Sequence, residues 1–195
     1  GAGHASAASS TLGAMTEPSV VAVARDGRHR FSKPVQHEIT LVAGLGVEGD
    51  AHFGETVQHR YDKRRTPNAP NNKQVHLMHA ELFSEIAADG FDVAPGDLGE
   101  NITTAGVDLL HLPLRTRLHL GESAVIELTG LRSPCTKIDA LGAGLMKRLI
   151  RRHDDGSVER LAGVMAIIVA GGTVAPGDEI RIELPSDPFE PLEPV

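Results

Sequence analysis

The sequence has one cysteine, Cys135, among its 195 residues. A single cysteine excludes a disulfide within the chain, so nothing in the sequence indicates an oxidising compartment. Tryptophan is absent and aromatic residues make up 3% of the chain, which argues against a stacking platform for single-stranded nucleic acid. No apolar run approaches the roughly 20 residues of a membrane span. We therefore expect a cytoplasmic protein with no membrane partner.

Positive charge is also scarce, since 19 Lys and Arg residues stand against 26 Asp and Glu residues and the formal net charge is -7. This balance argues against a general binder of nucleic acid phosphates, so no nucleic acid partner is expected. The length suits one domain that buries a substantial core.

The two ends of the sequence differ in composition from its middle. Residues 1–14 are small and polar, precede Met15, and lack the basic and apolar regions of a signal peptide. We interpret them as an added linker. Residues 185–195 are acidic and rich in proline, which predicts an extended tail on the surface. The expected domain therefore spans residues 15–184.

Hydrophobic periodicity predicts a mostly β (α+β) fold. Two helices are expected, at 79–89 and 141–152, the first from an apolar face that includes Leu82 and Ile86. Many short strands with glycine turns and few helices indicate a β-rich barrel with helical additions at its periphery. The expected strands are 19–24, 39–42, 75–78, 118–120, 124–129, 163–170 and 179–184.

A loop without apolar periodicity is expected at residues 54–73. Loops of this length are uncommon in compact domains and are usually binding loops or lids. Disorder is the alternative.

Cys135 follows a predicted strand in the segment Leu131-Arg-Ser-Pro-Cys-Thr-Lys137. Pro134 lacks an N–H donor and so ends the strand ladder, which leaves the cysteine on a loop. Arg132 and Lys137 favour the thiolate, the form that binds metals and attacks electrophiles. The alternative is a small buried apolar residue.

Two glycine-rich turns carry further candidate residues. In Gly46–Gly54, Asp50 and His52 lie two positions apart, a spacing that suits metal binding or proton transfer; a solvated turn is the alternative. In Gly96–Asn101, Glu100 and Asn101 offer acceptors and amide donors from a tight turn.

Four histidines suggest zinc as a rival metal, but none shows the spacing of a helical HExxH motif or of a paired-cysteine site. They are His52, His59, His76 and His79.

Two basic clusters stand out in this acidic chain. The first, at 59–65, includes Arg60, Lys63, Arg64 and Arg65 in the long loop, where it is expected to close on an anion such as a phosphate. The second, at 147–152, is expected to form the solvated face of the last helix.

Four segments together resemble the MOSC domain, a family named for the C-terminal part of molybdenum cofactor sulfurases, in its small single-domain bacterial form. Each segment is unspecific alone, whereas their order and spacing around one Arg-x-Pro-Cys cysteine are specific. The resemblance runs from about Val20 to Leu184. The segments are GVEGDAHFG at 46–54, PGDLGENITTAGVDLLHLP at 95–113, LTGLRSPCTKIDAL at 128–141 and GVMAIIVAGGTVAPGDEI at 163–180.

The resemblance implies a β-barrel with a pterin-based molybdenum cofactor at its mouth and Cys135 as the thiolate ligand of molybdenum. Cofactor-binding residues are expected among Arg132, Asn101, Glu100, His59, Arg60 and Lys137. Asp50 and His52 also match motif positions near the site, and one of them is expected to donate protons.

Small MOSC proteins that this chain resembles reduce N-hydroxylated compounds, including base analogues, to amines or amidines. The resemblance therefore implies a molybdenum-dependent oxidoreductase with a small N-hydroxylated substrate. The chain has no cysteine cluster to relay electrons, so a separate electron-donor protein is expected. It also lacks the pyridoxal-phosphate domain of full sulfurases, so pyridoxal phosphate is not expected.

Two other function classes stay open. Cys135 could carry a persulfide or transfer the cofactor, which would make the protein a sulfur or cofactor carrier. Alternatively, the domain could store or sense the cofactor without turnover. A homodimer is compatible with the sequence.

Overall fold

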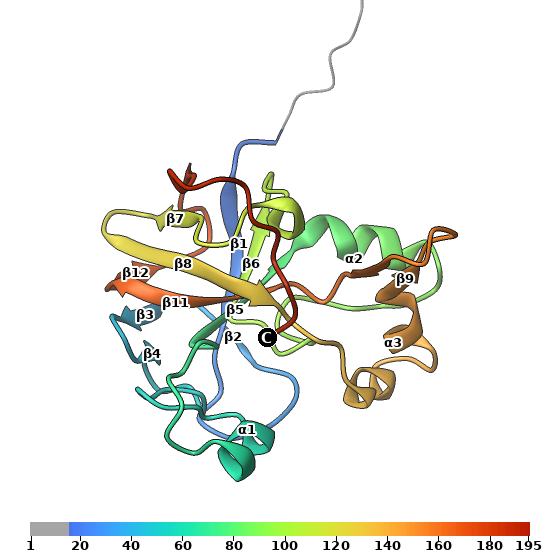
Figure 1. Cartoon of the computed structure of the whole chain (residues 1–195), viewed down its shortest axis with the longest axis horizontal. Helices are drawn as coiled ribbons and strands as arrows, with labels where there is room; N and C mark the ends of the chain where they lie inside the picture. Colours follow the sequence, from blue (N-terminus) through green and yellow to red (C-terminus); the bar gives the residue numbers. More distant parts are fainter. Residues whose placement is uncertain (1–15) are drawn as a thin grey trace, which may run out of the picture.

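An eight-stranded sheet forms the frame of the molecule (Figure 1). Hydrogen bonds order its strands β13-β7-β8-β11-β5-β6-β1-β2, and β5 with β6 is the parallel pair in an otherwise antiparallel sheet. The computed structural model describes residues 16–195; the expected linker at 1–14 lies outside them. The strand bounds are β1 Ser19–Ala24, β2 Val35–Gln36, β5 Val75–His79, β6 Ile102–Ala105, β7 Arg117–Leu120, β8 Ala124–Leu131, β11 Val164–Ala170 and β13 Ile180–Glu183.

Two smaller sheets flank this frame. One has the order β12-β3-β4 and the other pairs β9 with β10. In the large sheet the hydrogen-bonded order does not close into a ring among residues 16–195, although one isolated bridge joins Ser19 of β1 to Glu179 beside β13. The bounds are β3 Ile39–Val42, β4 Gly46–Val47, β9 Ile150–Arg152, β10 Val158–Arg160 and β12 Gly172–Val174.

Alternating burial explains why the central strands form. Along β8 the residues are buried and half-buried in turn, with Ala124, Ile126 and Leu128 facing inward, as a strand with one face on the core requires. These side chains belong to the larger hydrophobic cluster, which takes residues from most strands of the sheet. The expected strands at 19–24, 39–42, 75–78 and 124–129 are confirmed within a residue or two.

A second hydrophobic cluster lies beneath the helices at one side of the sheet. Leu82 and Ile86 of α2 pack there, which confirms the apolar face predicted for 79–89. Ile138 of the 3-10 helix η2 and Leu145 of α3 also belong to it. The helical bounds are α1 Arg60–Arg65, α2 Ala80–Ala87, η1 Leu109–His111, η2 Thr136–Ala140 and α3 Leu145–Arg148.

The helix predicted at 141–152 is wrong in its extent. It is reduced to the single turn of α3, and Ile150–Arg152 forms β9, which pairs with β10. Gly144 has a left-handed φ of 86°, so the helix begins only after it, at Leu145. The backbone groups of Ile150–Arg152 form hydrogen bonds with β10 and not with a preceding helical turn. The apolar spacing alone could not reveal this pairing.

Residues 54–73 also differ from expectation, whereas the tail lies extended along the surface, as predicted. The loop contains α1, whose residues are all unburied, so no apolar period marks it in the sequence. The tail is extended but is attached to the body: Leu192 is buried, and the Leu131 N–H donates to Glu193 O at 2.8 Å.

The protein is mostly β with few helices, as predicted. None of its described helices is long and apolar enough to span a membrane.

Candidate functional site

A pocket of about 450 Å³ opens between α1 and the loop that follows β8. Distant parts of the chain build its wall: the loop after β1, the loop after β4, the start of α1, residues 132–137 and Val195. Of the predicted site residues, Asp50 and Glu100 lie outside the lining and the rest form part of it. The predicted residues in the lining are His52, His59, Arg60, Asn101, Arg132, Cys135 and Lys137.

Cys135 lies in the pocket wall as a free, half-buried cysteine. Strand β8 ends at Leu131, and Cys135 occupies the position before η2, where its carbonyl accepts the Ile138 N–H at 3.0 Å. Because Ile138 is fully buried, this turn is anchored to the second core. The backbone at Cys135 is therefore held in place, with the thiol in the pocket wall.

Arg132 places a cation beside that cysteine. Its backbone N–H donates to Gly163 O at 3.0 Å, and its guanidinium lies 5.5 Å from the centre of the Phe31 ring. Burial lowers the pKa of Arg132, while the nearby charges of Cys135 and Glu100 oppose that shift. Its Nη1 is buried without a hydrogen-bond partner in the described structure. Buried donors are rarely left unpaired, so this nitrogen is available to a ligand that accepts a hydrogen bond.

Asp50 lies at the centre of a buried hydrogen-bond network behind the pocket. Its Oδ2 accepts hydrogen bonds from the Asp26 N–H, Asn101 Nδ2 and Lys33 Nζ at 3.2, 3.1 and 2.8 Å. Its Oδ1 accepts the His52 N–H and contacts His52 Nδ1, both at 3.0 Å. Burial would raise the pKa of Asp50, but these contacts outweigh it and hold the pKa well below its usual range. Asp50 is therefore a fixed carboxylate that orients its neighbours.

Lys33 was missed by the sequence analysis. Its side chain is 5% exposed, pairs with Asp50 and lines the pocket. Burial lowers the pKa of Lys33, and the charge of Asp50 partly restores it. A lone lysine in a polar loop carries no signal in the sequence, because its burial depends on a carboxylate 17 positions away.

Three histidine rings meet at one side of the pocket. His52 packs against His59 with ring centres 4.3 Å apart and against His29, edge to face, at 5.2 Å. Burial lowers the pKa of His59 to about 3, and it also lowers the pKa of His29. Both rings are therefore neutral at neutral pH. His52 Nδ1 faces Asp50, and its Nε2 forms no hydrogen bond within the described residues.

Asn101 and Glu100 support the pocket from behind. Asn101 Nδ2 donates to Ala24 O and to Asp50, and its Oδ1 accepts the His76 N–H at 3.2 Å. Glu100 is fully buried; Oε1 accepts the Gly96 N–H at 2.7 Å and Oε2 has no partner in the described structure. Burial raises the pKa of Glu100. These two residues therefore connect β1, β5 and the turn before β6.

The basic loop cluster divides at the pocket edge. Arg60 lines the pocket, whereas Lys63, Arg64 and Arg65 lie outside its wall. Lys73, also in the lining, pairs with Asp62 at 2.9 Å.

The zinc alternative gains no support from geometry. Among residues 16–195, no group of three or more His, Cys, Asp and Glu side chains is arranged to hold a metal ion. His76, one of the four histidines considered, is buried and its Nε2–H donates to Ala162 O at 2.8 Å. A metal held here by protein would depend on Cys135 together with donors from a cofactor.

The chain is similar to one protein family and to several solved structures. The model of the MOSC domain family matches residues 48–181. Among solved structures, the YuaD protein from Bacillus subtilis superposes with a TM-score of 0.67 at 22% identity, covering 85% of this chain and 95% of its own.

YiiM from Geobacillus stearothermophilus superposes with a TM-score of 0.63 at 16% identity, covering 89% and 79% of the two chains. YiiM from Escherichia coli superposes with a TM-score of 0.55 at 20% identity, covering 88% of this chain and 73% of its own. These likenesses show a shared fold. A search of curated proteins finds no match.

Proposed function

This chain belongs to the MOSC domain family, and on that premise we propose that it binds a molybdenum cofactor in the Cys135 pocket and reduces N-hydroxylated compounds. The family is associated with this cofactor. One observation carries the proposal: a free cysteine and a buried arginine nitrogen that has no hydrogen-bond partner among residues 16–195 share the wall of one pocket. By the same membership we assign the eight-stranded sheet to the MOSC type of β-barrel.

The residues present fit such a group. A thiolate is a soft ligand that suits molybdenum, and Cys135 is the only residue of the pocket that can supply one. Arg132 offers a buried donor without an acceptor, and Lys33, Arg60 and Lys137 add positive charge around the same space. These groups would hold the anionic phosphate of a pterin cofactor.

When bound, the cofactor supplies a two-electron redox centre. The overall reaction, R–NHOH + 2 e⁻ + 2 H⁺ → R–NH₂ + H₂O, breaks the N–O bond and consumes two protons. His52 is the proton donor that the geometry favours over Asp50, because Asp50 is held ionised and is fully hydrogen-bonded. Asp50 accepts a hydrogen bond from Nδ1–H of His52, so the proton that His52 would deliver to the pocket is one carried by Nε2.

Two variants test the proposal. Cys135→Ser should lose most bound molybdenum, since a hydroxyl is a poor ligand for a soft metal. His52→Ala should keep the metal and lose about 10²–10⁴-fold in turnover. The measurements are molybdenum and pterin content of protein from a cofactor-competent host, and reduction of an amidoxime with a chemical reductant. Arg64→Ala, on α1 but outside the pocket, is the matched control.

The outcomes separate the function classes. Equal molybdenum content in Cys135→Ser would refute the thiolate ligand. Loaded wild type that reduces no N-hydroxylated substrate would refute the reductase and favour cofactor storage. A mass gain of one sulfur atom on Cys135 would instead favour the persulfide carrier.

A further inference from the structure

The two basic clusters of this acidic chain differ in their ion pairing. Arg148 pairs with Glu85 and Asp89, and Arg151 pairs with Glu85 and Glu159. Two of the four cations near α3 are therefore paired within the fold, whereas Lys147 and Arg152 form no ion pair with any residue in 16–195. On α1 no basic side chain forms an ion pair with any residue in 16–195, since the one acid of the helix, Asp62, is occupied by Lys73.

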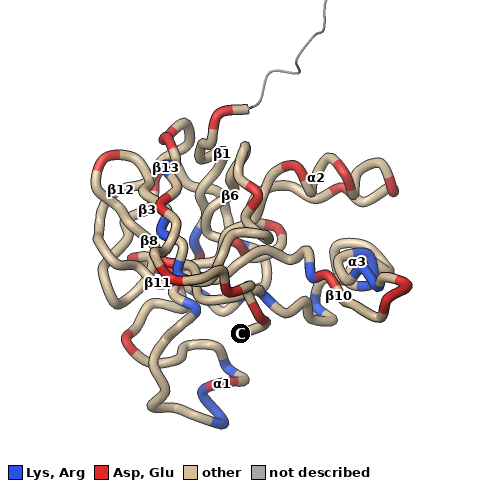
Figure 2. Tube along the Cα trace, turned by 45° about the horizontal axis from the view of Figure 1, so that its top comes forward, with Lys and Arg blue, Asp and Glu red and all other residues tan. Residues whose placement is uncertain are grey.

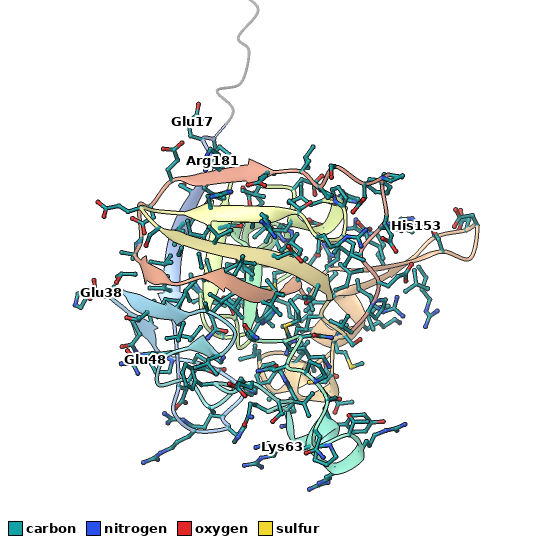
Figure 3. All side chains as sticks on the ribbon, turned by 60° about the vertical axis from the view of Figure 1, so that its left-hand side comes forward. Glu17, Glu38, Glu48, Lys63, His153 and Arg181 are labelled. Atoms are coloured by element: carbon teal, nitrogen blue, oxygen red, sulfur yellow. The ribbon has the colours of Figure 1, made fainter. Side chains whose placement is uncertain are left out.

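Helix α1 contributes nothing to the core. None of its residues is buried, and it lies at the opposite end of the molecule from β13 (Figure 2). The charge view shows its positive residues gathered there (Figure 2). Lys63 extends into solvent at this end, while Arg181 lies at the opposite end (Figure 3). Four exposed cations on a helix without a packing role indicate a functional surface.

The cations of α1 extend beyond what a pocket ligand could use. Arg60 reaches the pocket wall, whereas Lys63, Arg64 and Arg65 do not. Beside them Tyr61 is 67% exposed, with its hydroxyl 2.6 Å from Arg65 Nη1 and the Arg65 guanidinium 5.3 Å from its ring centre. Tyrosine and arginine are among the side chains that are enriched where proteins dock. The surface therefore fits a large acidic partner.

We propose that α1 is the docking surface for an acidic electron-transfer protein. This inference rests on the proposed function, because reduction of N–OH needs two electrons from outside and the chain has no cysteine cluster to relay them. A donor bound on α1 would lie beside the mouth of the Cys135 pocket. The net charge of -7 and the low aromatic content disfavour nucleic acid as the occupant.

The test is binding of an acidic plant-type ferredoxin to the full chain, measured over a salt series. The variant carries Lys63→Ala, Arg64→Ala and Arg65→Ala together. The control carries Lys147→Ala, Arg152→Ala and Arg181→Ala, which remove the same charge from exposed sites elsewhere on the molecule. We expect affinity at low salt to fall on the order of tenfold in the α1 variant, with a flatter salt dependence, and to stay unchanged in the control.

Equal weakening in both variants, or no salt-sensitive binding of wild type, would overturn the docking surface. Binding of duplex DNA or of anionic vesicles through the same residues, with ferredoxin unbound, would overturn it as well. Reduction driven by reduced methyl viologen should be the same in all three proteins. Its absence in loaded wild type would refute the reductase, while the binding series would still decide whether α1 docks an acidic protein.

Discussion

Replacing Asp50 with asparagine should reveal how much stability the buried network behind the pocket contributes. Asp50 is 2% exposed in its side chain, and Lys33, its partner at 2.8 Å, is 5% exposed. The substitution removes the carboxylate charge but leaves the lysine ammonium buried. It also turns an N–H toward donors that the carboxylate accepted from.

The expected loss is large because an isolated buried charge is costly. Removing one partner of a buried pair typically costs about 3–5 kcal/mol, and we expect Asp50→Asn to lose that much in the free energy of unfolding. Asp62→Asn is the matched control, since Asp62 and Lys73 are each 22% exposed in their side chains. This pair is more exposed than Asp50 and Lys33, so its loss should cost less, toward the about 0–1 kcal/mol of a surface pair.

The effect should depend on pH with a defined sign. The folded pKa of Asp50 lies below its unfolded value of about 3.9. Its contribution is therefore complete above that value and is lost as pH falls through the folded pKa. The difference in stability between wild type and Asp50→Asn should be constant near neutral pH and shrink in acid.

Urea unfolding of four proteins tests this reasoning: wild type, Asp50→Asn, Lys33→Met and the double variant. Lys33→Met should destabilise wild type, because it leaves Asp50 unpaired, but should stabilise Asp50→Asn, because it removes the buried ammonium. If Lys33→Met has the same effect in both backgrounds, the two side chains are not coupled and the reasoning is refuted.

Two further predictions concern residues around the pocket. Glu100→Gln should raise stability at neutral pH, because burial raises the pKa of Glu100. In wild type the free energy of unfolding should decline as pH rises from the unfolded pKa of about 4.3 to the raised folded pKa, and the variant should lack this decline. Unfolding at pH 4 and pH 7 measures this, and an unchanged pH slope would contradict it. Gly130→Ala should release the tail, because the new Cβ would meet Glu193 O at 2.5 Å and would collide with Val195 Cγ1. Hydrogen exchange should rise at the Leu131 and Val195 amides, and unchanged protection of both amides would contradict the prediction.

The sequence predicted those parts of the fold that depend on local periodicity. The alternation through Ile126 and Leu128 predicted β8, and Leu82 with Ile86 predicted α2, because each pattern matches one element with one buried face. The prediction of a helix at 141–152 was wrong in its extent because Ile150–Arg152 form β9, which is stabilised by β10, a partner that local spacing does not reveal.

The candidate site follows the same division. Arg132 and Cys135 line one pocket, as expected for a cysteine presented after Pro134. Lys33 and the role of Asp50 could not be predicted, because both depend on burial created by contacts between β1, the loop after β4 and the turn before β6. Their chemistry is a property of tertiary structure.

The attachment of the tail has a consequence for the order of events during biosynthesis. Val195 lines the pocket and its N–H donates to Leu131 O, while His29, far away in the sequence, lines the same pocket. A growing chain therefore cannot present the whole pocket until these segments, far apart in sequence, have met. Formation of contacts this distant in sequence is slow. A ligand of the whole pocket would bind only after folding and would then raise the melting temperature by mass action, so cofactor loading can be followed as a thermal shift.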